Sequence, residues 1–311
     1  MRNALVSLLM EDAANDPEMI FLTGDLGFSV VEPLKEALGD RFVNAGVAEA
    51  NMMSMAGALA ADGFHVYAYS IAPFIALRCY EQVRNDVCYG NRTVRLIGVG
   101  AGYSYGSLGP THHSLEDASV MAALPGMRVI SPATESELVS AHRTHSAWDG
   151  PMYYRIPRES GPEIAPLESE EDQAAVVYRP AGDVWIVTSG PSLAACLFAS
   201  EALAAEGVSA GVASVPLLTP FPADRLAGIV GPRPSVTVFE GFADNPLEAG
   251  MCSLSAARRI GPVAQVNAGR SFASVVGNTE FLREQAGLTA PAIAAAVREM
   301  VPRTERAGGR L

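Results

Sequence analysis

The sequence has few cations and few charged residues of any kind. Its 311 residues include 22 Lys and Arg against 34 Asp and Glu, giving a formal net charge of -12, and only 18% are charged. No basic run is present. Because positive charge is not concentrated anywhere, we expect neither a nucleic-acid partner nor a membrane partner. An anionic ligand would need a few local cations or a helix N-terminus.

Cysteine motifs and long apolar runs are also lacking. The four cysteines, Cys79, Cys88, Cys196 and Cys252, show no CxxC spacing and no nearby histidine that would complete a zinc site. Buried free thiols are therefore expected, and no metal site is predicted in this chain. No segment has 18 uninterrupted apolar residues, and no small-residue cleavage site follows the N-terminal apolar run. We expect a cytoplasmic protein.

What the sequence does contain is a regular alternation of strand and helix patterns, with 49% hydrophobic residues. The first set predicts strands at 19–25, 65–71, 94–102, 127–133 and 152–157, and helices over 3–13, 49–62, 74–89, 114–124 and 135–148. A second alternating set extends from 184 to 301. Such alternation is typical of mainly parallel sheets with helices on both faces. We expect an α/β fold with two doubly wound domains, residues 1–160 and 182–303, a linker at 161–181 and a tail at 304–311.

The loop GVGAGYSYGSLGPTHHS, residues 98–114, has the composition of a functional site. It contains five glycines and two adjacent histidines, and it follows a predicted strand. It lacks the lysine of a P-loop. The glycines of GAGYSYG stand at the first, third and seventh positions, whereas the dinucleotide fingerprint needs the first, third and sixth. Neither nucleotide motif is therefore indicated.

A second motif, LTGDLGFS at 22–29, partly matches the metal-diphosphate motif of thiamine enzymes. In that motif an Asp and a later Asn hold Mg²⁺ against a diphosphate. Here Leu26 replaces the third glycine, and Asn44 follows Asp25 too closely. The match fails, so Asp25 is interpreted as a strand-end residue of another subsite or of a dimer contact.

Two long blocks of the sequence resemble the C-terminal half of transketolase. They are FVNAGVAEANMMSMAGALAADGFHVYAYSIAPFIALRCYEQVRNDV and GSLGPTHHSLEDASVMAALPGMRVISPATESEL. The resemblance covers essentially the whole chain, with several blocks in the same order. It implies a pyrimidine-binding domain over 1–160 and a transketolase C-terminal domain over 182–303, most like the small subunit of a split transketolase.

The resemblance implies a cofactor, thiamine diphosphate, and assigns residues to it. Glu49 stands where the family's cofactor-activating glutamate hydrogen-bonds N1′ of the aminopyrimidine, and it is a predicted catalytic residue. Phe74 matches the aromatic that stacks on the pyrimidine ring. Ile71 stands where many members carry a second aromatic. Asp25 and Leu26 are further predicted cofactor contacts.

The resemblance also implies a substrate site. His112, in GPTHH, matches a histidine that binds or protonates the donor oxygen, and it is the second predicted catalytic residue. Arg155 falls where a phosphate-binding arginine is found, although structural salt bridging is equally compatible with it. Ser29 aligns with a further phosphate contact. Leu108 replaces an aspartate that recognises sugar hydroxyls, so we expect a less hydroxylated substrate than a usual sugar phosphate.

The family's diphosphate-binding domain, with its Mg²⁺ motif, has no counterpart in these 311 residues. The resemblance therefore implies a larger partner subunit that binds diphosphate and Mg²⁺, an α2β2 assembly, and no activity without the partner. The expected reaction moves a two-carbon ketol or acyl unit from a ketose or keto acid donor to an aldehyde or keto acceptor.

Three alternatives share the same fold. The beta subunit of a 2-oxo acid dehydrogenase has this two-domain plan, but the Gly-Pro-Thr-His block argues against it. A 1-deoxysugar synthase-like enzyme normally carries all domains in one chain. A regulatory subunit without catalytic function would not depend on Glu49.

Overall fold

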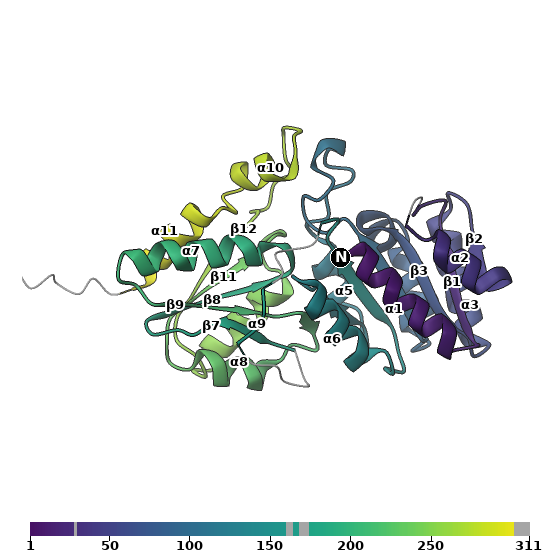
Figure 1. Cartoon of the computed structure of the whole chain (residues 1–311), viewed down its shortest axis with the longest axis horizontal. Coiled ribbons are helices and arrows are strands. Elements are labelled where there is room, and N and C mark those ends of the chain that lie inside the picture. The colour runs from purple at the N-terminus through teal and green to yellow at the C-terminus, as the bar shows by residue number, and fades with distance from the viewer. Residues whose placement is uncertain (28–29, 160–163, 168–173, 302–311) are drawn as a thin grey trace, which may run out of the picture.

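The computed structural model describes residues 1–27, 30–159, 164–167 and 174–301, which form two sheets (Figure 1). The first sheet has the strand order β10-β5-β6-β4-β3-β1-β2, and the second has the order β12-β11-β8-β9-β7. Neighbouring strands are parallel except for the pairs β10–β5 and β7–β9. The strands are β1 Met19–Thr23, β2 Phe42–Asn44, β3 His65–Ile71, β4 Val94–Val99, β5 Arg128–Ile130, β6 Met152–Ile156, β7 Val176–Arg179, β8 Val184–Ser189, β9 Ala210–Ser214, β10 Leu217–Thr219, β11 Ser235–Phe239 and β12 Val263–Asn267.

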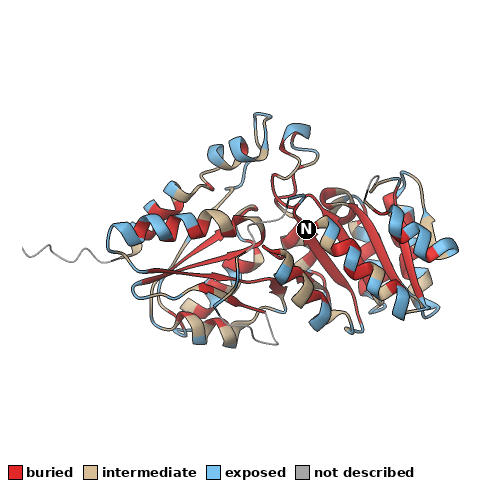
Figure 2. Ribbon diagram, viewed as in Figure 1, coloured by how far each residue is buried: buried red, intermediate tan, exposed pale blue. Residues whose placement is uncertain are grey.

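Helices cover both faces of each sheet, and buried residues concentrate in the strands and on the inward faces of the helices (Figure 2). The α-helices are α1 Arg2–Asn15, α2 Glu32–Leu38, α3 Glu49–Ala61, α4 Tyr80–Gln82, α5 Asp117–Ala122, α6 Glu135–His145, α7 Leu193–Ala205, α8 Ala223–Val230, α9 Pro246–Ala256, α10 Thr279–Gln285 and α11 Ala290–Met300. Two π-helical segments, η2 Phe74–Arg78 and η3 Val83–Cys88, flank α4.

Strand β1 shows how the sequence specifies these layers. Because successive side chains of a strand point to opposite faces, Met19 and Phe21 join the core beneath α1, α2 and α6, while Ile20 and Leu22 join the core beneath α3. The core beneath α3 continues into the second sheet, where it includes Trp185 of β8. The two domains therefore share a continuous apolar interior.

The prediction of two mainly parallel α/β domains is confirmed. Three local features differ from the sequence patterns. Residues 176–179, within the expected linker, form the edge strand β7 of the second sheet. Strand β10 follows the second domain's β9 yet pairs with β5 of the first sheet. The expected helix over 74–89 is π-helical in two of its three parts.

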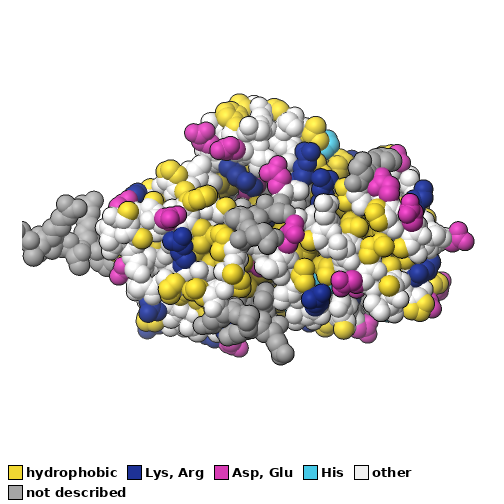
Figure 3. Space-filling model, in the orientation of Figure 1, with side chains coloured by type: hydrophobic (Ala, Val, Ile, Leu, Met, Phe, Trp, Pro, Cys, Tyr) yellow, Lys and Arg dark blue, Asp and Glu magenta, His cyan; other side chains and the backbone are white. Residues whose placement is uncertain are grey.

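The face seen in Figure 3 carries interspersed charges of both signs, and hydrophobic side chains also lie on the protrusion formed by α10 and its flanking loop. Phe272, Val276 and Phe281 are exposed there. Among the described residues, no helix combines the length and the apolar character needed to cross a bilayer.

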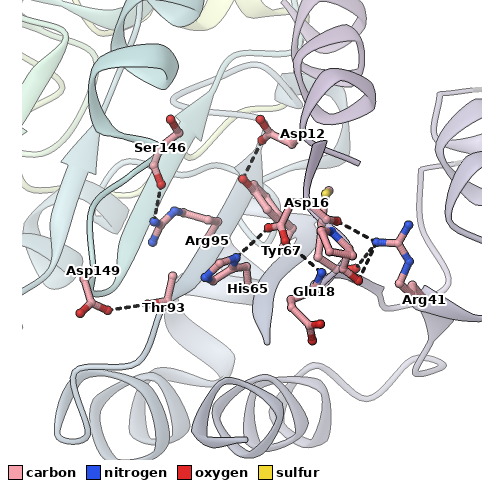
Figure 4. A network of polar contacts seen from close by, with 12 residues as sticks. Asp12, Asp16, Glu18, Arg41, His65, Tyr67, Thr93, Arg95, Ser146 and Asp149 are labelled. Carbon is pink, nitrogen blue, oxygen red and sulfur yellow. Dashed lines mark hydrogen bonds and ion pairs between the residues drawn. The ribbon is translucent and has the colours of Figure 1, made fainter. Parts of the chain in front are cut away.

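A polar network lies at the edge of the first sheet where β3 and β4 begin (Figure 4). Asp12 of α1 accepts a hydrogen bond of 2.7 Å from the Tyr67 hydroxyl, and its carboxylate lies 3.0 Å from His142 Nε2. Nearby, His65 Nδ1 lies 2.7 Å from Asp16 Oδ2. Burial raises the pKa of Asp12, but His142, Tyr67 and the charge of Arg95 outweigh it, so the net pKa lies below its ordinary value. The network ties α1 and α6 to the sheet.

Replacing Asp12 by Asn tests how much the Asp12 carboxylate contributes to the stability of the fold. Because the folded-state pKa is lowered, the carboxylate contributes stability that is complete above the unfolded value of 3.8 and is lost as pH falls through the folded value. We expect Asp12→Asn to lower the unfolding free energy at pH 7 by about 1 kcal/mol after allowance for partial solvent exposure. Urea unfolding should show this difference narrowing below pH 3.8. Glu11→Gln, on the exposed face of the same helix, should change little. A difference that persists unchanged in acid would contradict the account.

Candidate functional site

The first sheet has a switch point between β1 and β3, because the chain leaves β1 toward β2 on one side and returns to β3 on the other. Ligands of open α/β sheets bind beside the carboxyl ends of the strands at such a point. Gly24 follows β1, and a Cβ built there would lie 3.8 Å from Glu49 Cγ. Glu49, the first residue of α3, is therefore packed directly against the switch point.

Glu49 is a buried carboxylate with a cation beside it. Its side chain is 3% exposed, and its Oε2 accepts a 2.8 Å hydrogen bond from Arg78 Nη1. The position in the first turn of α3 also favours negative charge. The guanidinium carbon of Arg78 lies 4.4 Å from the centroid of the Phe74 ring. Glu49 and Phe74 thus share one neighbour, Arg78.

His112 completes this group from a different part of the chain. Its ring centroid lies 5.3 Å from that of Phe74, with the two planes at 64°. Its Nδ1 lies 3.0 Å from Thr111 Oγ1. Three of the residues singled out in the sequence, Glu49, Phe74 and His112, are therefore brought together by a helix, a π-helical segment and a loop. We call this group with Arg78 the carboxyl-edge cluster.

The π-helical segment explains why Arg78 reaches Phe74. Pro73 precedes the segment, and residues four apart on a helix are neighbours on its surface. Arg78 therefore lies back over the aromatic ring. The sequence interpretation did not single out Arg78, although an aromatic and an arginine four apart after a strand would have been a usable signal. π-Helical segments are also frequent at functional sites.

The loop that carries His112 is anchored by a buried glutamate of the second domain. Glu240 is fully buried, and its Oε1 accepts a 2.7 Å hydrogen bond from the Tyr103 N–H. Its Oε2 accepts a 2.6 Å hydrogen bond from Arg283 Nε. Gly102 has a φ of +64°, and a Cβ there would collide with the Glu240 carboxylate. The loop can approach Glu240 this closely only with glycine at that position.

His113 strengthens the same anchoring. Its side chain is 4% exposed, its Nε2 lies 3.2 Å from the Gly106 carbonyl, and its ring packs edge-on against Tyr103. Of the two adjacent histidines, His113 therefore faces the protein interior while the half-buried His112 faces Phe74.

The expectation that Arg155 binds a substrate phosphate does not fit this structure. Arg155 is fully buried, and its Nε donates to both carboxylate oxygens of Asp117 at 3.0 Å. Its Nη2 donates to the carbonyls of Ser114 and Glu240, each at 2.9 Å. Its Nη1 is buried without a hydrogen-bond partner among the described residues, and no part of the guanidinium is exposed to solvent. The salt-bridge interpretation is the one that the geometry supports.

The structure places the other predicted residues as follows. Leu108 is 53% exposed on the His112 loop, and Ile71 is half-buried at the end of β3. Asp25 and Leu26 line a neighbouring cavity of about 330 Å³, where the Asp25 N–H donates to Asn44 Oδ1 at 2.9 Å. Ser29 lies outside the described residues.

The chemistry of the cluster suits a planar nitrogen heterocycle. A buried carboxylate can accept a hydrogen bond from a ring N–H, an aromatic face can stack on a flat ring, and a half-buried imidazole can exchange a proton with a bound oxygen. Within the described part of the chain, no group of three or more His, Cys, Asp or Glu side chains is arranged to hold a metal ion. The carboxyl group of Glu49, the Phe74 ring and the His112 imidazole are side chains that fit the aminopyrimidine of thiamine.

Comparisons with known proteins agree over nearly the whole chain. The family model for "Transketolase, pyrimidine binding domain" matches residues 1–163, and that for "Transketolase, C-terminal domain" matches residues 173–293. A 6-deoxy-6-sulfo-D-fructose transketolase subunit from Clostridium sp. (strain MSTE9) is 33% identical over 97% of this chain and 95% of its own length. An apulose-4-phosphate transketolase subunit from Actinobacillus succinogenes is 29% identical over 73% of each chain.

Solved structures give the same result. A chain described as a split gene transketolase, inactive beta4 tetramer, has a TM-score of 0.85 and 30% identity, covering 96% of this chain and 97% of that one. The transketolase of Campylobacter jejuni has a TM-score of 0.82 at 18% identity, and the alignment covers 96% of this chain and 46% of that one. That second likeness concerns the fold alone.

Replacing Asp117 by Asn tests the buried ion pair. Removing the charge leaves Arg155 uncompensated in the interior, so we expect the unfolding free energy to fall by about 3 kcal/mol. Asp224→Asn is the matched control, because Asp224 is 97% exposed in its pair with Arg259. That control should lose less than about 1 kcal/mol in the same urea titration. Equal losses in the two variants would contradict the structural role given to Arg155.

Proposed function

The chain belongs to the transketolase family, and we propose that it is the pyrimidine-binding subunit of a two-chain, thiamine-diphosphate-dependent transketolase. The observation that carries the proposal is the carboxyl-edge cluster, in which Glu49, Phe74 and His112 meet at the switch point of the first sheet. In the proposed reaction a two-carbon ketol unit passes from a ketose donor to an aldehyde acceptor.

Each residue of the cluster has a distinct proposed task. Thiamine diphosphate, when bound, supplies the thiazolium carbon that carries the transferred unit. Glu49 would hold a proton between its carboxylate and N1′ of the pyrimidine, and Phe74 would orient the ring by stacking. His112, on its anchored loop, would hold a proton at the donor oxygen. Burial of Glu49 keeps water away from that hydrogen bond.

The proposed partner is a larger chain that binds the diphosphate and Mg²⁺, in an α2β2 assembly. The support comes from relatives. Proteins whose names describe transketolase subunits align over most of their own length with this chain. A further relative is described as a split gene transketolase.

The proposed substrate is a modified sugar that is less hydroxylated than a usual sugar phosphate. Leu108 offers no hydrogen-bond acceptor on its side chain, so it cannot recognise a hydroxyl there. Relatives are named as transketolase subunits for 6-deoxy-6-sulfo-D-fructose or apulose 4-phosphate, which supports a sugar outside the common pentose and hexose phosphates. Arg158 is exposed beside the loop, 5.7 Å from the Tyr105 ring, and it replaces Arg155 as the proposed contact for an anionic group.

The test is reconstitution with a chain that carries the diphosphate-binding domain, followed by a ketol-transfer assay. We expect Glu49→Gln to reduce kcat by about 10²- to 10⁴-fold, because an amide cannot take part in the proton transfer. Assembly, measured by size-exclusion chromatography, should be unchanged.

Glu201→Gln, on the exposed face of α7, is the matched control and should retain full activity. Full activity of the Glu49→Gln complex would remove the proposed mechanism and favour a regulatory subunit on the same fold.

A further inference from the structure

Arg78 makes two contacts at once, and both are to residues proposed to receive the cofactor. Its Nη1 donates to Glu49 Oε2 at 2.8 Å, and its guanidinium carbon lies 4.4 Å from the centre of the Phe74 ring. The mechanism proposed above uses Glu49 and Phe74 but gives Arg78 no task. The role of the Arg78 cation beside Glu49 and Phe74 therefore needs an explanation.

A guanidinium and an aminopyrimidine present similar chemistry to such a site. Both are planar, both carry N–H donors at their edge, and both stack on aromatic faces. The Glu49 carboxylate that accepts from a guanidinium N–H can accept equally from N1′ of the pyrimidine when that nitrogen carries the proton shared between them, and Phe74 offers one ring to both. On this basis we propose that Arg78 occupies the pyrimidine position in the chain without cofactor, and that it moves aside when thiamine diphosphate binds.

Exposure determines which member of the pair moves. The Arg78 side chain is 50% exposed, whereas Glu49 is 3% exposed. Arg78 is the last residue of its π-helical segment, and Cys79 after it leaves helical geometry with φ -112° and ψ 27°. The guanidinium can therefore turn toward water on its flexible stem, while the Glu49 carboxylate remains fixed at the start of α3.

The exchange also explains how the buried Glu49 carboxylate remains paired when no cofactor is bound. An unpaired buried charge is costly, so Glu49 needs a cationic or N–H partner at all times. Arg78 provides that partner until another donor arrives. Arg78 is therefore a residue that sets cofactor affinity, because binding must first displace its ion pair and its stacking on Phe74.

A fixed structural counter-ion is the alternative, and it makes the opposite prediction. If Arg78 only neutralises Glu49 and stays in place, its removal would weaken or leave unchanged the binding of an aminopyrimidine. If Arg78 competes for the site, its removal strengthens binding. This inference rests on the proposed function, because it takes Glu49 and Phe74 as the pyrimidine contacts.

The experiment is calorimetric titration of thiamine into the full-length chain alone and into its complex with the partner. We expect Arg78→Ala to bind thiamine about fivefold more tightly than the wild type. This ratio of dissociation constants corresponds to the free energy of a half-exposed ion pair, which the cofactor no longer has to break. Arg78→Lys should fall between them, since lysine keeps the charge without the planar stacking surface.

Arg84→Ala is the matched control, because Arg84 is an exposed arginine in the next π-helical segment. Thiamine is a cation, so removing any nearby positive charge assists it slightly, and the control measures that general effect. Thermal unfolding of each variant establishes that it folds. If Arg78→Ala does not fold, the binding comparison is made with Arg78→Lys instead.

Equal or weaker binding by the folded Arg78 variants, or no binding by any of them, would overturn the inference. The proposed function fails separately, through full ketol-transfer activity of the Glu49→Gln complex. Tighter thiamine binding in the Arg78 variants with a Glu49-independent reaction would therefore support the exchange and reject the mechanism.

Discussion

The packing of the two domains and the position of the glycine-rich loop depend on one buried cation at the domain junction. Arg155 on β6 binds Asp117 of the first domain and the carbonyl of Glu240 in the second, and Glu240 in turn holds the backbone of the glycine-rich loop. A Cβ built at Gly190, after β8, would lie 3.6 Å from Arg155 Nη1. The crevice between β8 and β11, where the second sheet reverses its strand order, is thus filled by the first domain. The switch point of the first sheet instead carries Glu49, packed beside Gly24.

This junction explains how a loop with five glycines can hold a histidine in a defined place. Gly102 lets the loop touch Glu240, and His113 fixes it from within through the Gly106 carbonyl. Residues of both domains therefore hold the loop that places His112 against Phe74. Buried charges of this kind contribute more to geometry than to net stability, because the cost of desolvation offsets much of their attraction.

Much of the fold and three of the four residues of the cluster follow from sequence. Alternating strand and helix patterns specify the two sheets, since periodicity reports which faces are buried. Strand β10 could not be predicted this way, because its three residues pair antiparallel with a strand far earlier in the chain, and local pattern says nothing about such a partner. The resemblance to transketolase singles out Glu49, Phe74 and His112, and the structure brings these three side chains together. The burial of Arg155 and the contact of Arg78 with Glu49 could not be predicted, because both depend on tertiary packing.

The central claim is that the carboxyl-edge cluster of the first sheet receives the pyrimidine of the cofactor. Hydrogen exchange with mass spectrometry, on the assembled complex with and without thiamine diphosphate and Mg²⁺, tests it most directly. The account predicts slower exchange on cofactor binding in residues 46–53, 74–78 and 109–114, with no change near His65 at the opposite edge of the sheet. Protection confined to the His65 region, or none in the three segments, would contradict it.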